Sequence, residues 1–297
     1  MVLLAACATV APPSGPGASP SFARPPALSP GDPGVALVLS GGAARGYAHI
    51  GVIKVLEAHG LRPSIIVGSS AGSIVGALYA SGLSPVELER AVGELGIGQF
   101  NDWVIPGLGS LPSPMGLVRG DGLRRFVDDR VLHHRIEDFP IRYAAVATDL
   151  QTGAVQIFNA GDAGRAVHAS SAAPGVIMPA RIGGRLYVDG QISSPIPVEA
   201  ARQLGARKVI AVDVIYPPED AYVSDTMGVL FQSFIISIHR LKTLELAQAD
   251  QVIAPELPHT TGQMSFSDRG ALIAAGAKAA TQALARIKPL FEPPKPP

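Results

Sequence analysis

Gly68-Ser69-Ser70-Ala71-Gly72 is the stretch of this 297-residue chain that decides its fold. The apolar run before it, residues 64–67, has the composition of a buried strand, and the small and apolar residues after it, 73–80, predict a helix. A Gly-x-Ser-x-Gly between a strand and a helix is the pattern of a nucleophile elbow, which exposes its serine on a sharp turn. The unpaired N–H groups at the start of the helix would favour a negative charge beside Ser70.

The pattern alone is a weak signal, because glycine and serine are abundant in this chain. A serine in a glycine-rich turn with only a structural role would explain it equally well. The segments on either side of the motif therefore decide how it is interpreted.

Those segments predict an α/β fold. A continuous apolar run at 35–40 is typical of a strand buried on both faces of a parallel sheet, and a helix is predicted at 47–59. Ser84-Pro85-Val86-Glu87 is a capping box with proline at the first helical position. An alternation of strands and helices indicates βαβ crossovers around a parallel sheet. Later helices are predicted at 122–131, 162–169, 198–204, 226–249 and 268–290, and later strands at 141–148, 154–158, 186–189, 208–213 and 251–254.

Composition sets the domain boundaries. Residues 1–34 are rich in proline and predict a linker, residues 35–290 form the expected domain, and 291–297 form a proline-rich tail. Leu4-Ala5-Ala6-Cys7 resembles a bacterial lipoprotein box, and Cys7 is the only cysteine. The segment before it is short for a signal peptide. We expect a membrane-anchored lipoprotein of the bacterial cell envelope if Cys7 is lipidated, and a cytoplasmic protein otherwise.

The remaining composition excludes several classes of protein. Basic and acidic residues balance at 24 each, so nothing predicts the basic face of a nucleic-acid-binding protein. No hydrophobic run is long enough to span a bilayer.

Residues 98–120, which include Trp103, lack periodicity, and they fit either a lid over a site or a surface loop.

A serine nucleophile needs an oxyanion hole, and Gly41-Gly42-Ala43 is the candidate. The three residues join the first strand to a helix, so their amides can face a developing negative charge. A dinucleotide-binding turn is the competing interpretation. It fits poorly, because Ala43 replaces the middle glycine and the second strand ends in Gly68-Ser69 instead of an acidic residue.

The base is harder to identify. An α/β-hydrolase order would require His239, which lies within a predicted helix, or His259, which lies in a polar loop. Asp189 ends an apolar strand before Gly190, and ligands bind at strand ends in open α/β sheets. An ordinary turn would also explain Asp189-Gly190.

Four blocks, in this order, resemble the patatin-like phospholipase family, most closely its bacterial branch: residues 38–46, 68–72, 169–174 and 189–190. The resemblance covers roughly residues 35 to 255. It implies a three-layer α/β/α fold with a mainly parallel central sheet and a Ser–Asp dyad without histidine. Ser70 then corresponds to the nucleophile, Asp189 to the base, and Gly41, Gly42 and Ala43 to the oxyanion loop.

Two positions depart from the family pattern. Ala43 stands where a third glycine is usual, and Gln191 follows Asp189-Gly190 where glycine or alanine is commoner. The resemblance implies a lipid acyl hydrolase that acts on phospholipid, lysophospholipid or related esters, near a membrane surface and with no cofactor or metal. A histidine-dependent esterase and an inert lipid-binding protein remain alternatives. Since an unperturbed aspartate with a pKa near 3.9 is a poor base, we expect burial to raise the pKa of Asp189.

Overall fold

The computed structural model describes residues 19–95, 102, 115–220, 223–257 and 268–293. Within these ranges the core is an eight-stranded sheet in the order β5-β6-β3-β2-β1-β7-β8, with β4 also paired to β3. Strands β1, β2, β3, β7 and β8 pair in parallel, whereas β4, β5 and β6 pair antiparallel. The strands are β1 (Val35–Leu39), β2 (Ile65–Ser69), β3 (Arg142–Asp149), β4 (Val155–Phe158), β5 (Ala180–Ile182), β6 (Arg185–Asp189), β7 (Lys208–Val212) and β8 (Gln251–Ile253).

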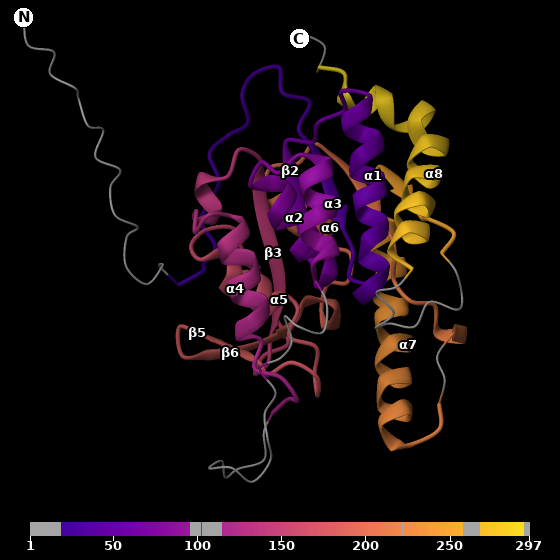
Figure 1. Cartoon of the computed structure of the whole chain (residues 1–297). Coiled ribbons are helices and arrows are strands. Elements are labelled where there is room, and N and C mark those ends of the chain that lie inside the picture. The colour runs from indigo at the N-terminus through magenta and orange to yellow at the C-terminus, as the bar shows by residue number, and fades with distance from the viewer. Residues whose placement is uncertain (1–18, 96–101, 103–114, 221–222, 258–267, 294–297) are drawn as a thin grey trace, which may run out of the picture.

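Helices cover both faces of this sheet, which confirms the predicted three-layer α/β/α fold (Figure 1). One face packs against α1, α2, α3, α4, α5 and α8, and the other packs against α6 and α7. The helices are α1 (Tyr47–Ala58), α2 (Ala71–Ala80), α3 (Pro85–Gly93), α4 (Asp121–Arg130), α5 (Ala163–Ser170), α6 (Val198–Gln203), α7 (Thr226–Leu246) and α8 (Arg269–Ile287).

The central strands are apolar throughout because both of their faces are buried. In β1, Leu37 and Leu39 join the core under α1 and α8, while Ala36 and Val38 join the core under α6. The carboxyl ends of β1 and β2 lie side by side, since Leu39 pairs with Gly68. The Gly41–Ala43 loop and Ser70 therefore leave the sheet at the same edge.

The N-terminal segment 21–34 lies against the domain. Ser21 pairs with Ala160, Arg142 donates a hydrogen bond of 2.8 Å to the Pro26 carbonyl, and the Ser64 hydroxyl donates one of 2.5 Å to Asp32. These contacts join part of the predicted linker to the residues after β4, to the start of β3 and to the residue before β2. Cys7, the tail 294–297 and most of the 98–120 loop lie outside the described residues.

Helix α7 packs against the sheet with only part of its length. Its N-terminal end extends below the body of the domain in the view of Figure 1. It exposes Val229, Leu230, Ile236 and Leu244, of which Leu230 is 58% exposed. In the described part of the chain, no helix combines the length and the apolar character needed to cross a bilayer.

Candidate active site

Ser70 occupies a strained turn between β2 and α2. Its backbone has φ 51° and ψ −124°, a left-handed conformation that is costly for a residue with a Cβ. The turn closes tightly around glycines, because a Cβ on Gly68 would lie 2.3 Å from the Gly72 carbonyl oxygen and one on Gly72 would lie 2.2 Å from the Leu39 carbonyl oxygen. The structure therefore has the strand, sharp turn and helix that a nucleophile elbow requires.

The side chain of Ser70 points to Asp189, which is 119 residues away in the sequence. The Ser70 hydroxyl donates a hydrogen bond of 2.7 Å to Oδ2 of Asp189. The other carboxylate oxygen, Oδ1, accepts one of 2.9 Å from the Gln191 amide. Burial raises the pKa of Asp189 to about 6, and the two hydrogen bonds oppose that rise. The pKa of this carboxyl group is thus closer to neutral pH than that of an exposed aspartate, as expected from the sequence.

Residues 169–174 are hydrogen-bonded to the backbones of both Ser70 and Asp189. The Ser70 amide donates to both the carbonyl and the hydroxyl oxygen of Ser170, each at 3.1 Å. The Ser170 hydroxyl in turn donates to the Val146 carbonyl on β3. Two residues further on, the Ala172 carbonyl accepts a hydrogen bond from the Asp189 amide. One short segment therefore sets the positions of both backbones, a role of Ser170 that the sequence did not reveal.

Gly190 and Thr148 fix the turn after Asp189. A Cβ on Gly190 would lie 2.1 Å from the Val146 carbonyl oxygen, so the residue after the aspartate has no room for a side chain. The Thr148 hydroxyl donates a hydrogen bond of 2.9 Å to the Asp189 carbonyl. These contacts explain Asp189-Gly190 as a packed strand end next to β3, where spacing alone also fitted an ordinary turn.

Ser40 fixes the start of the Gly41–Ala43 loop through two hydrogen bonds. The Ser40 hydroxyl donates to the Gly41 carbonyl and accepts from the Val214 amide, both at 2.9 Å. Ala43 has φ 49° and is exposed, so its methyl group is accommodated in a left-handed conformation that glycine would adopt more readily. Gly42 has no room for a side chain, because a Cβ there would lie 2.7 Å from the Val214 carbonyl oxygen.

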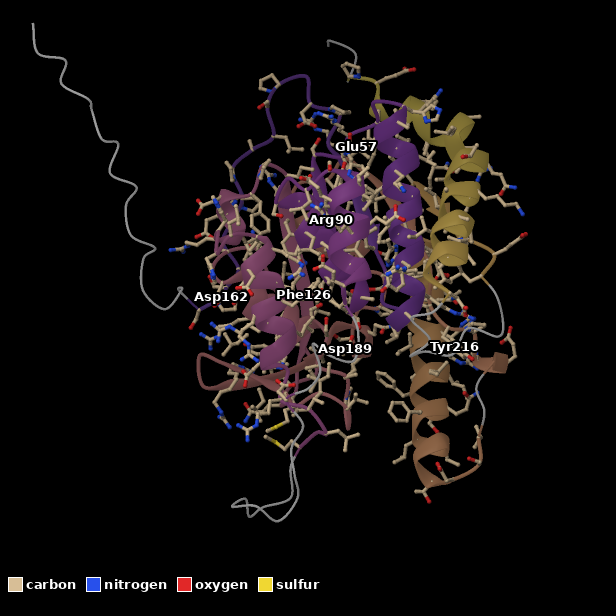
Figure 2. The ribbon with its side chains drawn as sticks, in the orientation of Figure 1. Glu57, Arg90, Phe126, Asp162, Asp189 and Tyr216 are labelled. Atoms are coloured by element: carbon tan, nitrogen blue, oxygen red, sulfur yellow. The ribbon has the colours of Figure 1, made fainter. Side chains whose placement is uncertain are left out.

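Two of these loop residues and both members of the Ser–Asp pair line one cavity of about 100 Å³. Gly41 does not line this cavity, and the Gln191 side chain lies against it. Figure 2 shows Asp189 and Tyr216 at the lower edge of the body, near the level from which α7 extends. Most of the cavity wall is apolar, and α7 contributes four of its side chains, namely Phe231, Phe234, Ile235 and Ile238. The sequence predicted this helix but not its place in the site.

The structure describes only one of the two candidate histidines. His239 lies on α7 but does not line the cavity, and His259 lies outside the described residues.

Arg45 is buried, with its guanidinium carbon 4.3 Å from the centre of the Tyr216 ring, so it supports the cavity wall. Among the side chains that the structure describes, no cluster of three or more His, Cys, Asp or Glu could hold a metal ion.

Comparison with known proteins agrees with this geometry. The family model described as patatin-like phospholipase matches residues 37–202, more than half of the chain. An uncharacterised NTE family protein of Mycobacterium tuberculosis is 37% identical over 190 residues, which are 61% of this chain and 49% of that protein. Lysophospholipase NTE1 of Kluyveromyces lactis is 35% identical over 181 residues, which are 61% of this chain and 12% of that protein.

The chain thus spans about half the length of the mycobacterial relative and a small part of the yeast one. Among solved structures, VipD from Legionella pneumophila has a similar fold, with a TM-score of 0.57 at 15% identity over 87% of this chain and 67% of VipD. The match of the family model across the elbow, the Gly41–Ala43 loop and Asp189 shows that this chain belongs to the patatin-like phospholipase family.

Proposed function

We propose that this protein is a serine lipid acyl hydrolase that works through a Ser70–Asp189 dyad. The observation that carries the proposal is the 2.7 Å hydrogen bond from the Ser70 hydroxyl to the buried Asp189 carboxylate, in the wall of a mostly apolar cavity. Serine is a weak nucleophile until a base removes its proton, and Asp189 is in contact with that proton.

The reaction follows from this contact. Ser70 Oγ attacks the ester carbonyl carbon while its proton passes to Asp189. The bond from that carbon to the alcohol oxygen then breaks, and the leaving alcohol takes the proton from Asp189. Water next gives a proton to Asp189 and attacks the acyl carbon. The bond from that carbon to Ser70 Oγ then breaks, which releases the fatty acid, and Oγ takes the proton back from Asp189.

Stabilisation of the oxyanion is assigned to the Gly41–Ala43 loop and the start of α2. Two of the loop residues line the cavity together with Ser70. A well-placed oxyanion donor contributes about 3 kcal/mol to the transition state. A carboxylate with a pKa of about 6 is also a stronger base than an exposed aspartate, because burial disfavours its charge.

The substrate we propose is a phospholipid, a lysophospholipid or a related ester. The apolar side chains of α7 suit an acyl chain, and a yeast relative is named a lysophospholipase. Residues 226–238 of α7 contain no charged side chain. Since the inner face of this helix lines the cavity and its outer face exposes Val229, Leu230 and Ile236, we propose that the lipid surface contacts α7.

The test is hydrolysis of lysophosphatidylcholine and of short and long p-nitrophenyl esters by the purified protein. We expect activity in the wild type and a loss of at least about 10³-fold in Ser70→Ala and Asp189→Asn. His239→Ala and His259→Ala should stay active, and a comparable loss in either would favour a histidine-dependent esterase. Full activity in folded Ser70→Ala would refute the proposal.

The location of the protein is a separate proposal. We propose that Cys7 carries a lipid that tethers the domain to the bacterial envelope. The mass of the N-terminal peptide from the native host tests it: a lipid-modified Cys7 at the mature N-terminus is expected, and an unmodified internal Cys7 would contradict it.

A further inference from the structure

Gln191 is one of the two positions at which the chain departs from the family pattern. It lies in the short 3₁₀ helix Gly190–Ile192, directly after the proposed base. Its amide is committed to Asp189, to which it donates a hydrogen bond of 2.9 Å. This bond fixes the backbone at residue 191 and therefore the direction in which the side chain leaves it.

The Gln191 side chain lies on Gly41. A Cβ added to Gly41 would be 2.1 Å from the carboxamide carbon of Gln191 and 2.4 Å from its oxygen. The carboxamide thus occupies the space that the missing side chain of Gly41 leaves open. This contact places the carboxamide against the loop to which we assign the oxyanion donors.

The same side chain also faces the cavity. Gln191 lines it beside Ser70 and Asp189, in a wall that is otherwise mostly apolar. Tyr216, which also lines the cavity, lies under the guanidinium of Arg45. Within the described residues the structure records no hydrogen bond from the Gln191 carboxamide, which is partly exposed. A side-chain amide carries two N–H donors, so this group has donors to offer a bound ester.

We propose that Gln191 is a further oxyanion donor, whose side-chain N–H group hydrogen-bonds to the ester carbonyl oxygen as Ser70 attacks it. This inference rests on the proposed function. Side-chain amides act as oxyanion donors in acyl transfer, and they contribute most where charge develops in a site shielded from water. A donor of this kind strengthens in the transition state, so its removal lowers kcat more than it raises KM.

The test compares Gln191→Met, which keeps the length of the side chain without its donors, with Gln191→Gly, which removes the side chain. Gln203→Met on α6 is the control, because Gln203 is exposed and does not line the cavity. With a short p-nitrophenyl ester, we expect kcat to fall about 10- to 100-fold in both Gln191 variants, with KM changed less than about threefold. The rate of serine labelling by a fluorophosphonate, whose P=O oxygen occupies the oxyanion position, should fall in parallel.

Wild-type kcat and labelling in Gln191→Met would overturn the inference, and Gln191 would then only fill the space over Gly41. A fall in the kcat of Gln191→Met would also count against the inference if its melting temperature fell well below that of Gln203→Met. The loss of activity would then be structural. In both cases an inactive Ser70→Ala beside an active wild type leaves the proposed function intact. A wild type that neither hydrolyses esters nor labels would instead overturn both.

Discussion

The two walls of the cavity are built in different ways. The wall at the strand ends is set by backbone: Ser70 is strained, Gly68 and Gly72 have no space for a Cβ, and Ser170 holds the elbow amide. The wall formed by α7 is set by side chains, with Phe231 and Phe234 facing the cavity from a helix that is largely exposed. The first wall fixes the chemistry and tolerates little change. The second presents apolar side chains to the cavity, among them the partly buried Phe231 and Phe234.

Asp189 provides the largest expected effect. Because a base must be ionised, kcat/KM should rise with pH through an apparent pKa of about 6 and fall about tenfold per unit below it. Asp189→Asn should remove this dependence together with about 10³-fold of the activity. A pH profile flat between 5 and 7 in the wild type, with chemistry rate-limiting, would contradict the role of Asp189.

The same substitution should stabilise the fold above pH 6. The pKa of Asp189 is raised in the folded state, so the carboxyl group favours folding below about pH 4, and this contribution is lost as the pH rises through about 6. At pH 8 we expect the free energy of unfolding of Asp189→Asn to exceed that of the wild type by up to about 3 kcal/mol. Urea denaturation at pH 8 measures it, and lower stability of the variant would contradict the assigned burial of charge.

Gly72→Ala tests the rigidity of the strand-end wall. A Cβ there would overlap the Leu39 backbone, which cannot move without disrupting β1, so we expect a loss of more than about 3 kcal/mol in unfolding free energy. Gly270→Ala in α8 is the matched control, because nothing lies within 4 Å of its added Cβ. That control should be neutral or slightly stabilising. Equal stability of the two variants would show that the elbow is less constrained than its geometry indicates.

Phe234→Ala tests the α7 wall. Removing the ring takes apolar contact from an acyl chain, so kcat/KM for a long-chain ester should fall about tenfold, while that for an acetyl ester should change less than about threefold. Leu132→Ala, at a side chain 75% exposed and outside the cavity, is the control. An equal loss on both esters would mean that α7 affects the chemistry as well.

Substitutions of Glu245 test how α7 is joined to residues 194–196, which follow the proposed base. The smallest effect is expected here. The Glu245 carboxylate accepts hydrogen bonds from the Ser194 hydroxyl and, at 2.7 Å, from the Ile196 amide, and burial raises its pKa to about 7. Glu245→Ala leaves these donors unpaired and should lower kcat/KM about three- to tenfold. Glu245→Gln can pair with both and should stay within about twofold. A Gln variant as impaired as the Ala variant would show that the charge matters instead.

The sequence predicted the fold well because its signals are local. Buried strands at 35–40 and 208–213, the Ser84 capping box and the elbow all depend on neighbouring residues, and the structure confirms each of them. Pairing Ser70 with Asp189 depended on family resemblance, because no local signal relates residues 119 apart. The place of α7 could not be predicted, since apolar residues at helical spacing are equally typical of a helix packed in the core. Gln191 was noticed only as a departure from the family pattern.

The most direct test of the central claim is fluorophosphonate labelling of the full chain, followed by peptide mass spectrometry, alongside Ser70→Ala and Asp189→Asn. The account predicts one adduct, on Ser70, in the wild type, none in Ser70→Ala and much slower labelling in Asp189→Asn. An adduct on another residue, or labelling of Ser70 at the wild-type rate without the Asp189 carboxylate, would contradict the dyad.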